Sequence, residues 1–158
     1  MNTSIEQPHD LKAVLCEAGP LSDSIQSIMQ ASSTAWSIGF EDGTMVLVEW
    51  IPGPPRVAMS ASIGAPPPRR RATMHSVALS YNMLWRETDG VRIGQAGDEE
   101  TMLLMQDVHV GSASTQELAR ALEHFARLAA WWGAYVETDE AFETVEPRDF
   151  MAAMASRV

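Results

Sequence analysis

The stretch of sequence from Trp36 to Val48 reads WSIGFEDGTMVLV and contains a complete hairpin pattern. Apolar residues alternate with small residues from Trp36 to Phe40, and this period of two is typical of a half-buried strand. Asp42-Gly43 is a dipeptide that favours a tight hairpin turn. Met45 to Val48 is an unbroken apolar run, which predicts a central strand covered on both faces.

Three further strands are predicted after this hairpin. Apolar and small residues alternate from Val57 to Ile63, and Pro66-Pro67-Pro68 ends that strand because proline cannot join a sheet ladder. A second hairpin is predicted between Val91 and Val110, with a polar tip from Gly97 to Glu100. The chain therefore combines at least five strands with the helices that surround them.

Three helices are predicted. The first runs from about Pro8 to Ala18, with Leu11, Val14 and Leu15 on one face, and the second from about Ala72 to Arg86. The third begins at the capping-box pattern Ser114-Thr115-Gln116-Glu117. It continues with apolar residues on one face at Leu118, Leu122, Phe125, Ala129, Trp132 and Val136. Between the first helix and the first strand, the polar residues 21–34 favour at most a short helical turn.

The predicted helix from Ala72 to Arg86 is apolar on more than one side, because Leu79 and Met83 lie off its main stripe. One side can pack on the chain's own sheet, and the simplest second partner is another copy of the chain. Deep burial within one chain is the alternative. The residues predicted to form a homodimer interface are Val77, Tyr81, Leu84, Trp85, Val91 and Ile93.

Composition excludes several classes of protein. The net charge of −10 disfavours nucleic-acid binding, which depends on neutralising phosphates. The single cysteine, Cys16, excludes an intramolecular disulfide framework, fits a reducing cytoplasm and is predicted to be buried. We see no secretory signal and no apolar run of the ~18 residues that a membrane span needs, so we expect a soluble cytoplasmic protein without membrane insertion.

No residue pattern indicates catalysis. The histidines are scattered, and no metal-ligand spacing, phosphate-binding loop or nucleophile motif occurs, so we expect no enzyme, no cofactor and no metal site. Ten methionines favour an adaptable binding surface, although they can equally fill the core. The Arg69-Arg70-Arg71 run is either a solvated helix entrance or a contact for an acidic segment.

We divide the chain into a flexible N-terminus at residues 1–9, one domain at residues 10–136 and an acidic extension at residues 137–158. The extension is either solvated or a docking peptide. The fold class is α+β, a twisted antiparallel sheet flanked by helices in the order helix, three strands, helix, two strands, helix.

This order resembles the class I type III secretion chaperones, the Tir chaperone family. The residues 44–48 and 57–61 are similar to the family's early sheet, and Leu79-Ser80-Tyr81-Asn82-Met83-Leu84 is similar to the end of its dimer helix. The segment from Leu103 to Trp132 is similar to its last strand and long helix. The resemblance covers about Leu11 to Val136.

The resemblance implies a homodimeric chaperone of a Gram-negative bacterium that holds an effector's extended N-terminal segment soluble and secretion-competent in the cytoplasm. A contact with the export ATPase is left open. An extended segment can add a strand to a sheet edge while pockets select its side chains. Seven residues are predicted to line the effector groove: Leu11, Val14, Leu15, Ile38, Phe40, Val46 and Met59.

Two alternatives remain open. One is a regulatory or structural protein with the same fold and no effector. The other is a small enzyme or ligand-binding α+β domain, which would need a concave pocket with converging polar groups.

Overall fold

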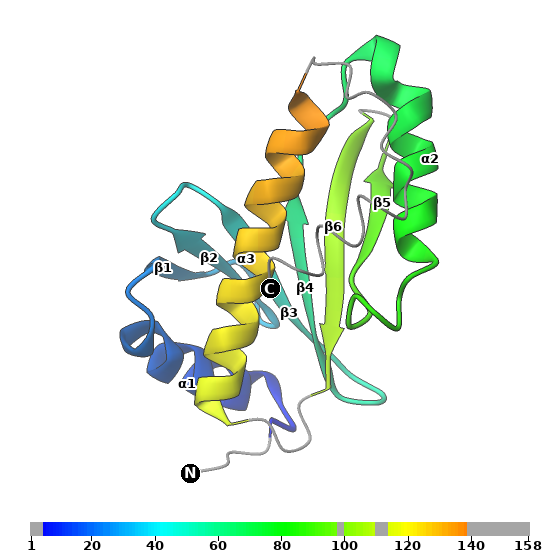
Figure 1. Cartoon of the computed structure of the whole chain (residues 1–158). Helices are drawn as coiled ribbons and strands as arrows, with labels where there is room; N and C mark the ends of the chain where they lie inside the picture. The colour runs from blue at the N-terminus through cyan, green and yellow to red at the C-terminus, as the bar shows by residue number, and fades with distance from the viewer. Residues whose placement is uncertain (1–4, 98–99, 110–113, 139–158) are drawn as a thin grey trace.

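The computed structural model describes residues 5–97, 100–109 and 114–138. Within these ranges a single antiparallel sheet has the strand order β1-β2-β3-β4-β6-β5, and the three α-helices lie together on one of its faces (Figure 1). The elements are α1 (Pro8–Ala18), β1 (Ile25–Gln30), β2 (Ala35–Phe40), β3 (Met45–Ile51), β4 (Arg56–Ser62), α2 (Arg71–Asn82), β5 (Arg92–Ala96), β6 (Thr101–Val108) and α3 (Thr115–Glu137), with 3₁₀ turns at Gly19–Leu21 and Pro68–Arg70.

The predicted fold class is confirmed, and so is the hairpin on which it was based. β2 pairs with β3 from Ala35 opposite Glu49 to Gly39 opposite Met45. Gly43 has a φ of 84°, a conformation that glycine adopts without steric cost, and the Thr44 amide donates to Asp42 Oδ1 at 2.9 Å. These local contacts fix the turn and with it the register of the two strands.

The core lies between the sheet and the helices. All six residues predicted on the apolar face of α3 are buried. Trp132 packs edge-to-face on Tyr81 of α2, with ring centroids 5.0 Å apart, so α2 and α3 share one layer. Burial of each large side chain contributes about 2 kcal/mol before entropy is counted, which makes α3 the main cover of the sheet.

The predicted capping box at the start of α3 is also confirmed. Ser114 Oγ accepts from the Glu117 amide at 3.2 Å, and the Ser114 amide donates to the Glu117 carboxylate at 2.7 Å. The hydrogen bond from the Ser114 backbone, followed by the one from its hydroxyl, lowers the pKa of Glu117. The ionised carboxylate therefore favours the folded helix start.

One strand was missed. Residues Ile25–Gln30 form β1, where the sequence favoured a helical turn. A bulge between Ile25 and Ser27 shifts the register, so Ile25 lies opposite Phe40 and Ile28 lies opposite Ile38. Both isoleucines therefore face the core in spite of their odd spacing, because a bulge breaks the period of two.

Several smaller expectations were wrong. Ile5 is buried in the core, although residues 1–9 were expected to be flexible. Cys16 is exposed because it lies off the buried face of α1. β3 is covered on one face only, and Met45 on the other face is exposed. Val110 and the extension from residue 139 onward lie outside the described residues.

Candidate protein-binding surface

One face of the sheet has no helix over it in the described part of the chain (Figure 1), and we call it the open face. Its side chains are those that alternate with the core positions. A single cross-strand row spans all the strands and consists of Met29, Ser37, Leu47, Ser60, Met105 and Arg92. The open face is therefore a continuous surface rather than a set of separate patches.

The open face combines exposed apolar side chains with small and polar ones. Met29 and Met45 are 55% and 47% exposed, which is unusual for large apolar side chains. A Cβ atom added to Gly39 would lie 3.3 Å from Met45 Sδ, and one added to Gly94 would lie 2.8 Å from Met105 Cε. These methionines thus lie flat across glycines of the neighbouring strands, and Met adapts easily to varied partners.

Charged side chains border the open face near β5. Asp107 lies 3.6 Å from Arg56 Nε and 3.3 Å from Arg92 Nη2. The three side chains are 30–46% exposed, so these ion pairs add little stability. They make a polar rim beside the exposed apolar side chains, as in many protein interfaces.

The two edges of the sheet differ. At the β5 edge, the Asn82 side chain donates to the Ile93 carbonyl at 2.9 Å and accepts from the Ile93 amide at 2.8 Å, so α2 occupies part of this edge. In the described residues β1 pairs only with β2. The outer edge of β1 therefore presents main-chain groups on which an extended peptide could add a strand.

α2 presents a second apolar surface. Leu79 and Met83 are 69% and 78% exposed, and Trp85, which follows the helix, is 56% exposed with the Arg86 guanidinium 4.7 Å from its ring centroid. Leu79 is on the side of α2 opposite the stripe that packs on the core, whereas Met83 is the C-cap residue and Trp85 lies in the turn that follows. Three large exposed apolar residues close together in sequence indicate a candidate interaction site.

The residues predicted for a homodimer interface fall into two groups. Tyr81, Val91 and Ile93 are buried within the chain, whereas Trp85 is exposed and Val77 and Leu84 are partly buried. The main stripe of α2 faces the chain's own core, and the side that carries Leu79 is the free one. The homodimer itself stays a prediction.

The seven residues predicted to line an effector groove all lie in the core: Leu11, Val14, Leu15, Ile38, Phe40, Val46 and Met59. In this conformation a partner cannot reach them, because each is at most 5% exposed. They pack together in the core, where α1 meets the sheet. The exposed Met45 of β3 was missed because the sequence does not say which face the helices cover, and Met29 was missed because β1 was not predicted as a strand.

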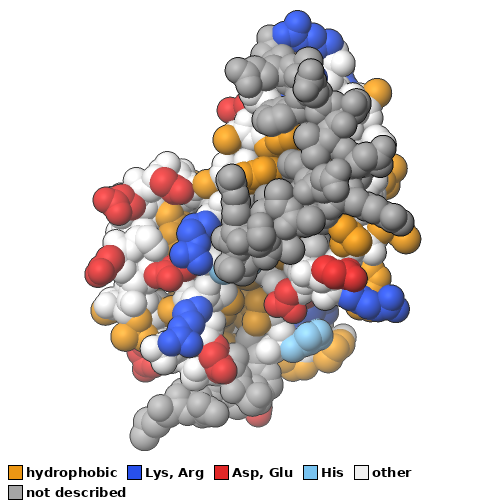
Figure 2. All heavy atoms as spheres, in the orientation of Figure 1, with side chains coloured by type: hydrophobic (Ala, Val, Ile, Leu, Met, Phe, Trp, Pro, Cys, Tyr) orange, Lys and Arg blue, Asp and Glu red, His pale blue; other side chains and the backbone are white. Residues whose placement is uncertain are grey.

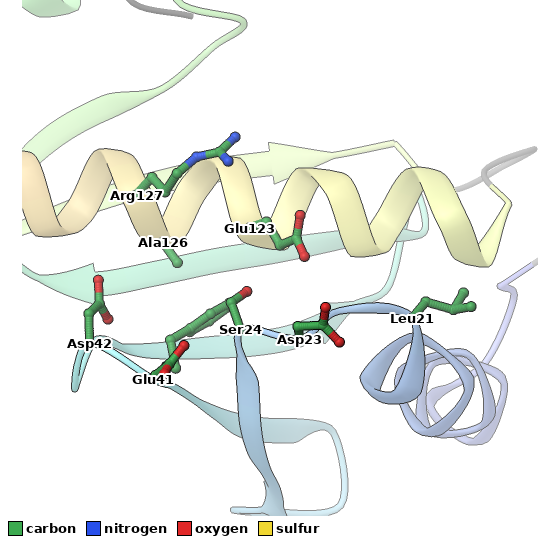
Figure 3. Close-up of a pocket in the computed structure, with 9 residues that line it drawn as sticks. Leu21, Asp23, Ser24, Glu41, Asp42, Glu123, Ala126 and Arg127 are labelled. Atoms are coloured by element: carbon green, nitrogen blue, oxygen red, sulfur yellow. The ribbon is translucent and has the colours of Figure 1, made fainter.

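A pocket of about 540 Å³ with several charged lining residues lies beside α3 and the β2–β3 turn (Figure 3). Its lining includes the carboxylates of Asp23, Glu41, Asp42 and Glu123 and the guanidinium of Arg127. Hydrogen bonds from the hydroxyl and then the amide of Thr44 lower the pKa of Asp42, which keeps it ionised at neutral pH. Among the described lining residues there is no histidine or cysteine.

A metal site and a membrane span are two other features for which the described residues give a clear result. No group of three or more His, Cys, Asp or Glu side chains is arranged to hold a metal ion within these residues. None of the helices in the described ranges combines the length and apolar character of a membrane span.

These surfaces define an α+β protein-binding domain with one uncovered sheet face. The sequence model of the Tir chaperone protein (CesT) family matches residues 33–132, which is more than half of the chain. The chain belongs to this family, which is a family of chaperones, and the resemblance seen in the sequence is confirmed. No curated protein matches the chain.

Two solved structures have a similar fold. One is the crystal structure of the ExsC–ExsE complex, with a TM-score of 0.67 and 14% identity over 85% of this chain and 99% of that chain. The other is the structure of the HopA1–SchA chaperone–effector complex, with a TM-score of 0.60 and 11% identity over 78% of this chain and 92% of that chain. At these identities the similarity is one of fold.

Proposed function

We propose that this protein is a type III secretion chaperone. It binds the extended N-terminal segment of an effector protein in the bacterial cytoplasm and keeps that segment soluble and ready for secretion. The observation that carries the proposal is the uncovered, methionine-rich sheet face in a member of a chaperone family. The similarity of fold to the chaperone in a chaperone–effector complex supports it.

The effector segment contacts the open face and the outer edge of β1. Main-chain hydrogen bonds at an edge strand give affinity with little dependence on sequence, and apolar pockets then select alternate side chains. Met29 and Met45 supply flexible apolar contacts close to that edge. The seven buried residues predicted for the groove hold these strands in place instead of touching the effector.

The functional unit in this proposal is a homodimer, with α2 at the two-fold axis. The support is the exposure of Leu79 on the free side of α2 and of Met83 and Trp85 directly after the helix, whose other side already packs on the core. A second copy would bury these side chains against the same side chains of its partner, as a two-fold interface requires. Binding, not chemistry, is the activity of this dimer.

The test begins with affinity purification of the tagged chain from its native cytoplasm and identification of the co-purified secreted protein by mass spectrometry. The N-terminal segment of that protein is then titrated into purified chain by calorimetry. The double variant Met29→Asp, Met45→Asp should weaken binding by about 10-fold or more, because two apolar contacts are lost. Its thermal unfolding should stay close to that of the wild type, since both residues are exposed.

Leu21→Asp is the matched control. Leu21 is also a large exposed apolar residue, but it lies in the 3₁₀ turn beside the pocket and away from the open face. It should leave affinity unchanged. The chaperone proposal fails if no secreted protein binds the purified chain; the assignment of the surface fails if both variants bind as the wild type does.

A further inference from the structure

Arg70, the middle residue of three consecutive arginines, contacts the end of α3. Arg70 Nη1 donates to the Tyr135 carbonyl at 3.0 Å and also to the Thr138 carbonyl, and the guanidinium lies 5.2 Å from the Tyr135 ring centroid. Arg71 pairs with Glu100 at the tip of the β5–β6 hairpin. Figure 1 shows the end of α3 beside the start of α2 at the same end of the molecule. The basic cluster Arg69–Arg71 is therefore at the point where the chain leaves α3.

The residues that follow carry the complementary charge. Residues 139–146 read DEAFETVE and contain four carboxylates and no basic residue. Thr138, the C-cap residue, has an extended conformation, with φ −64° and ψ 137°, so α3 ends at the Arg70 contact. The first carboxylates follow directly in sequence and are therefore tethered near the arginines, and charges interact over about 10 Å at moderate salt.

α3 has an apolar flank close to this point. Leu128, Trp131 and Tyr135 are spaced along one side of the helix and are only partly buried, and the Trp131 and Tyr135 rings stack with centroids 5.4 Å apart. Figure 2 shows apolar side chains at the surface on this face of the molecule. From Leu128 to Thr138 the helix rises about 15 Å.

The C-terminal segment has the length and side chains to cover that flank. Its 20 residues, 139–158, span up to about 65 Å when extended. Its larger apolar residues are Phe142, Val145, Phe150, Met151, Met154 and Val158. Because the segment is tethered beside the flank, its effective concentration there is in the millimolar range for a short linker, which no free partner reaches easily.

We propose that residues 139–158 fold back along α3 of their own chain, with their first carboxylates on the Arg69–Arg71 cluster and their apolar side chains on the flank formed by Leu128, Trp131 and Tyr135. The segment thus binds to the helix-covered side of its own chain. A partner that binds this flank has to displace it. The proposal does not depend on effector binding, which uses the opposite side of the sheet.

Paramagnetic broadening in the full chain tests the proposal. Cys16 is exposed and is first replaced by Ser; a spin label is then attached through Ala152→Cys. The amide signals of Leu128, Trp131, Tyr135 and the arginine cluster should lose most of their intensity, whereas those of β1 and β2 should not. Absent or evenly spread broadening overturns the proposal.

Two comparisons separate the causes. The variant E140Q/E143Q/E146Q should reduce the broadening, while D23N/E41Q/E87Q, with the same change in net charge at exposed sites elsewhere, should leave it unchanged. Equal effects of the two variants overturn the role of the arginine cluster.

Mixing spin-labelled chain with isotope-labelled, unmodified chain distinguishes a contact within one chain from a contact between two copies. Broadening that persists undiminished in the mixture assigns the flank to a second copy and overturns the intrachain contact.

Discussion

Ser114 and Glu117 determine where the longest helix begins. Each satisfies a backbone amide of the other, and these amides would otherwise lack partners at the first turn. The pair lies at the first turn of α3 and fixes the start of the helix. Local hydrogen bonding, rather than burial, sets this boundary.

Replacement of Ser114 by Ala should lower the free energy of unfolding by about 1 kcal/mol, because the Glu117 amide loses its acceptor. Urea denaturation monitored by circular dichroism measures the change. Gln116→Ala is the control: Gln116 is exposed two residues later in the same turn and has no capping role. Equal losses in the two variants would show that helix propensity, not the cap, accounts for the effect.

The sequence predicted the buried side of α3 residue by residue, because a long helix with a regular stripe has only one side to bury. It did not predict which of the six residues assigned to the homodimer interface are exposed. Trp85 is accessible and Tyr81 is not, although both were placed in one set. Tyr81 is buried by Trp132, a residue distant in sequence, and such contacts have no local signature.

Elements with regular patterns were predicted well and irregular ones were not. α1 begins and ends where the sequence indicated, and the hairpin of β2 and β3 follows from alternation and turn residues. β1 was missed because its bulge places Ile25 and Ile28 on one face at a spacing that also suits a helix. The pairing partner, not the strand itself, resolves that ambiguity.

α2 is the element on which the proposed dimer depends. Leu79→Asp or Met83→Asp should reduce the mass measured by light scattering from twice the chain mass to 17.3 kDa, because a carboxylate would be buried without a partner at the two-fold axis. Aspartate at Tyr81 would be uninformative, since that side chain belongs to the core.

Thr73→Asp is the control for this experiment. It adds the same charge to an exposed position on another side of α2 and should leave the mass unchanged. A wild-type chain that already has the monomer mass would remove the homodimer from the proposal without affecting the open face.

At the scale of the whole molecule, net charge opposes self-association. Each chain carries −10, so a dimer concentrates charge of one sign, and the apolar surface of α2 has to offset that repulsion. Added sodium chloride should therefore lower the dimer dissociation constant, because salt screens the repulsion and leaves apolar burial intact. Sedimentation equilibrium at low and high salt measures this. A dissociation constant that rises with salt would indicate an interface held by ion pairs.

The arrangement of the layers was predictable only in part. Strands and helices were evident, and α+β follows from their order. Which face of the sheet stays open was not, because each strand alternates between two faces and only the packing of α1, α2 and α3 together selects one. The candidate site has the same limit, because the residues predicted on β2, β3 and β4 point to the covered face of the sheet.

The bulge in β1 has a consequence for the free protein. An exposed edge with a long regular ladder invites the same edge of another copy, and aggregation begins in that way. The irregularity between Ile25 and Ser27 leaves only a few residues with uninterrupted spacing of donors and acceptors. A peptide that can adjust its own path still fits such an edge, whereas a second rigid strand with the same bulge does not. In the proposed function this edge would therefore bind a flexible effector segment and would not pair with the same edge of a second folded copy.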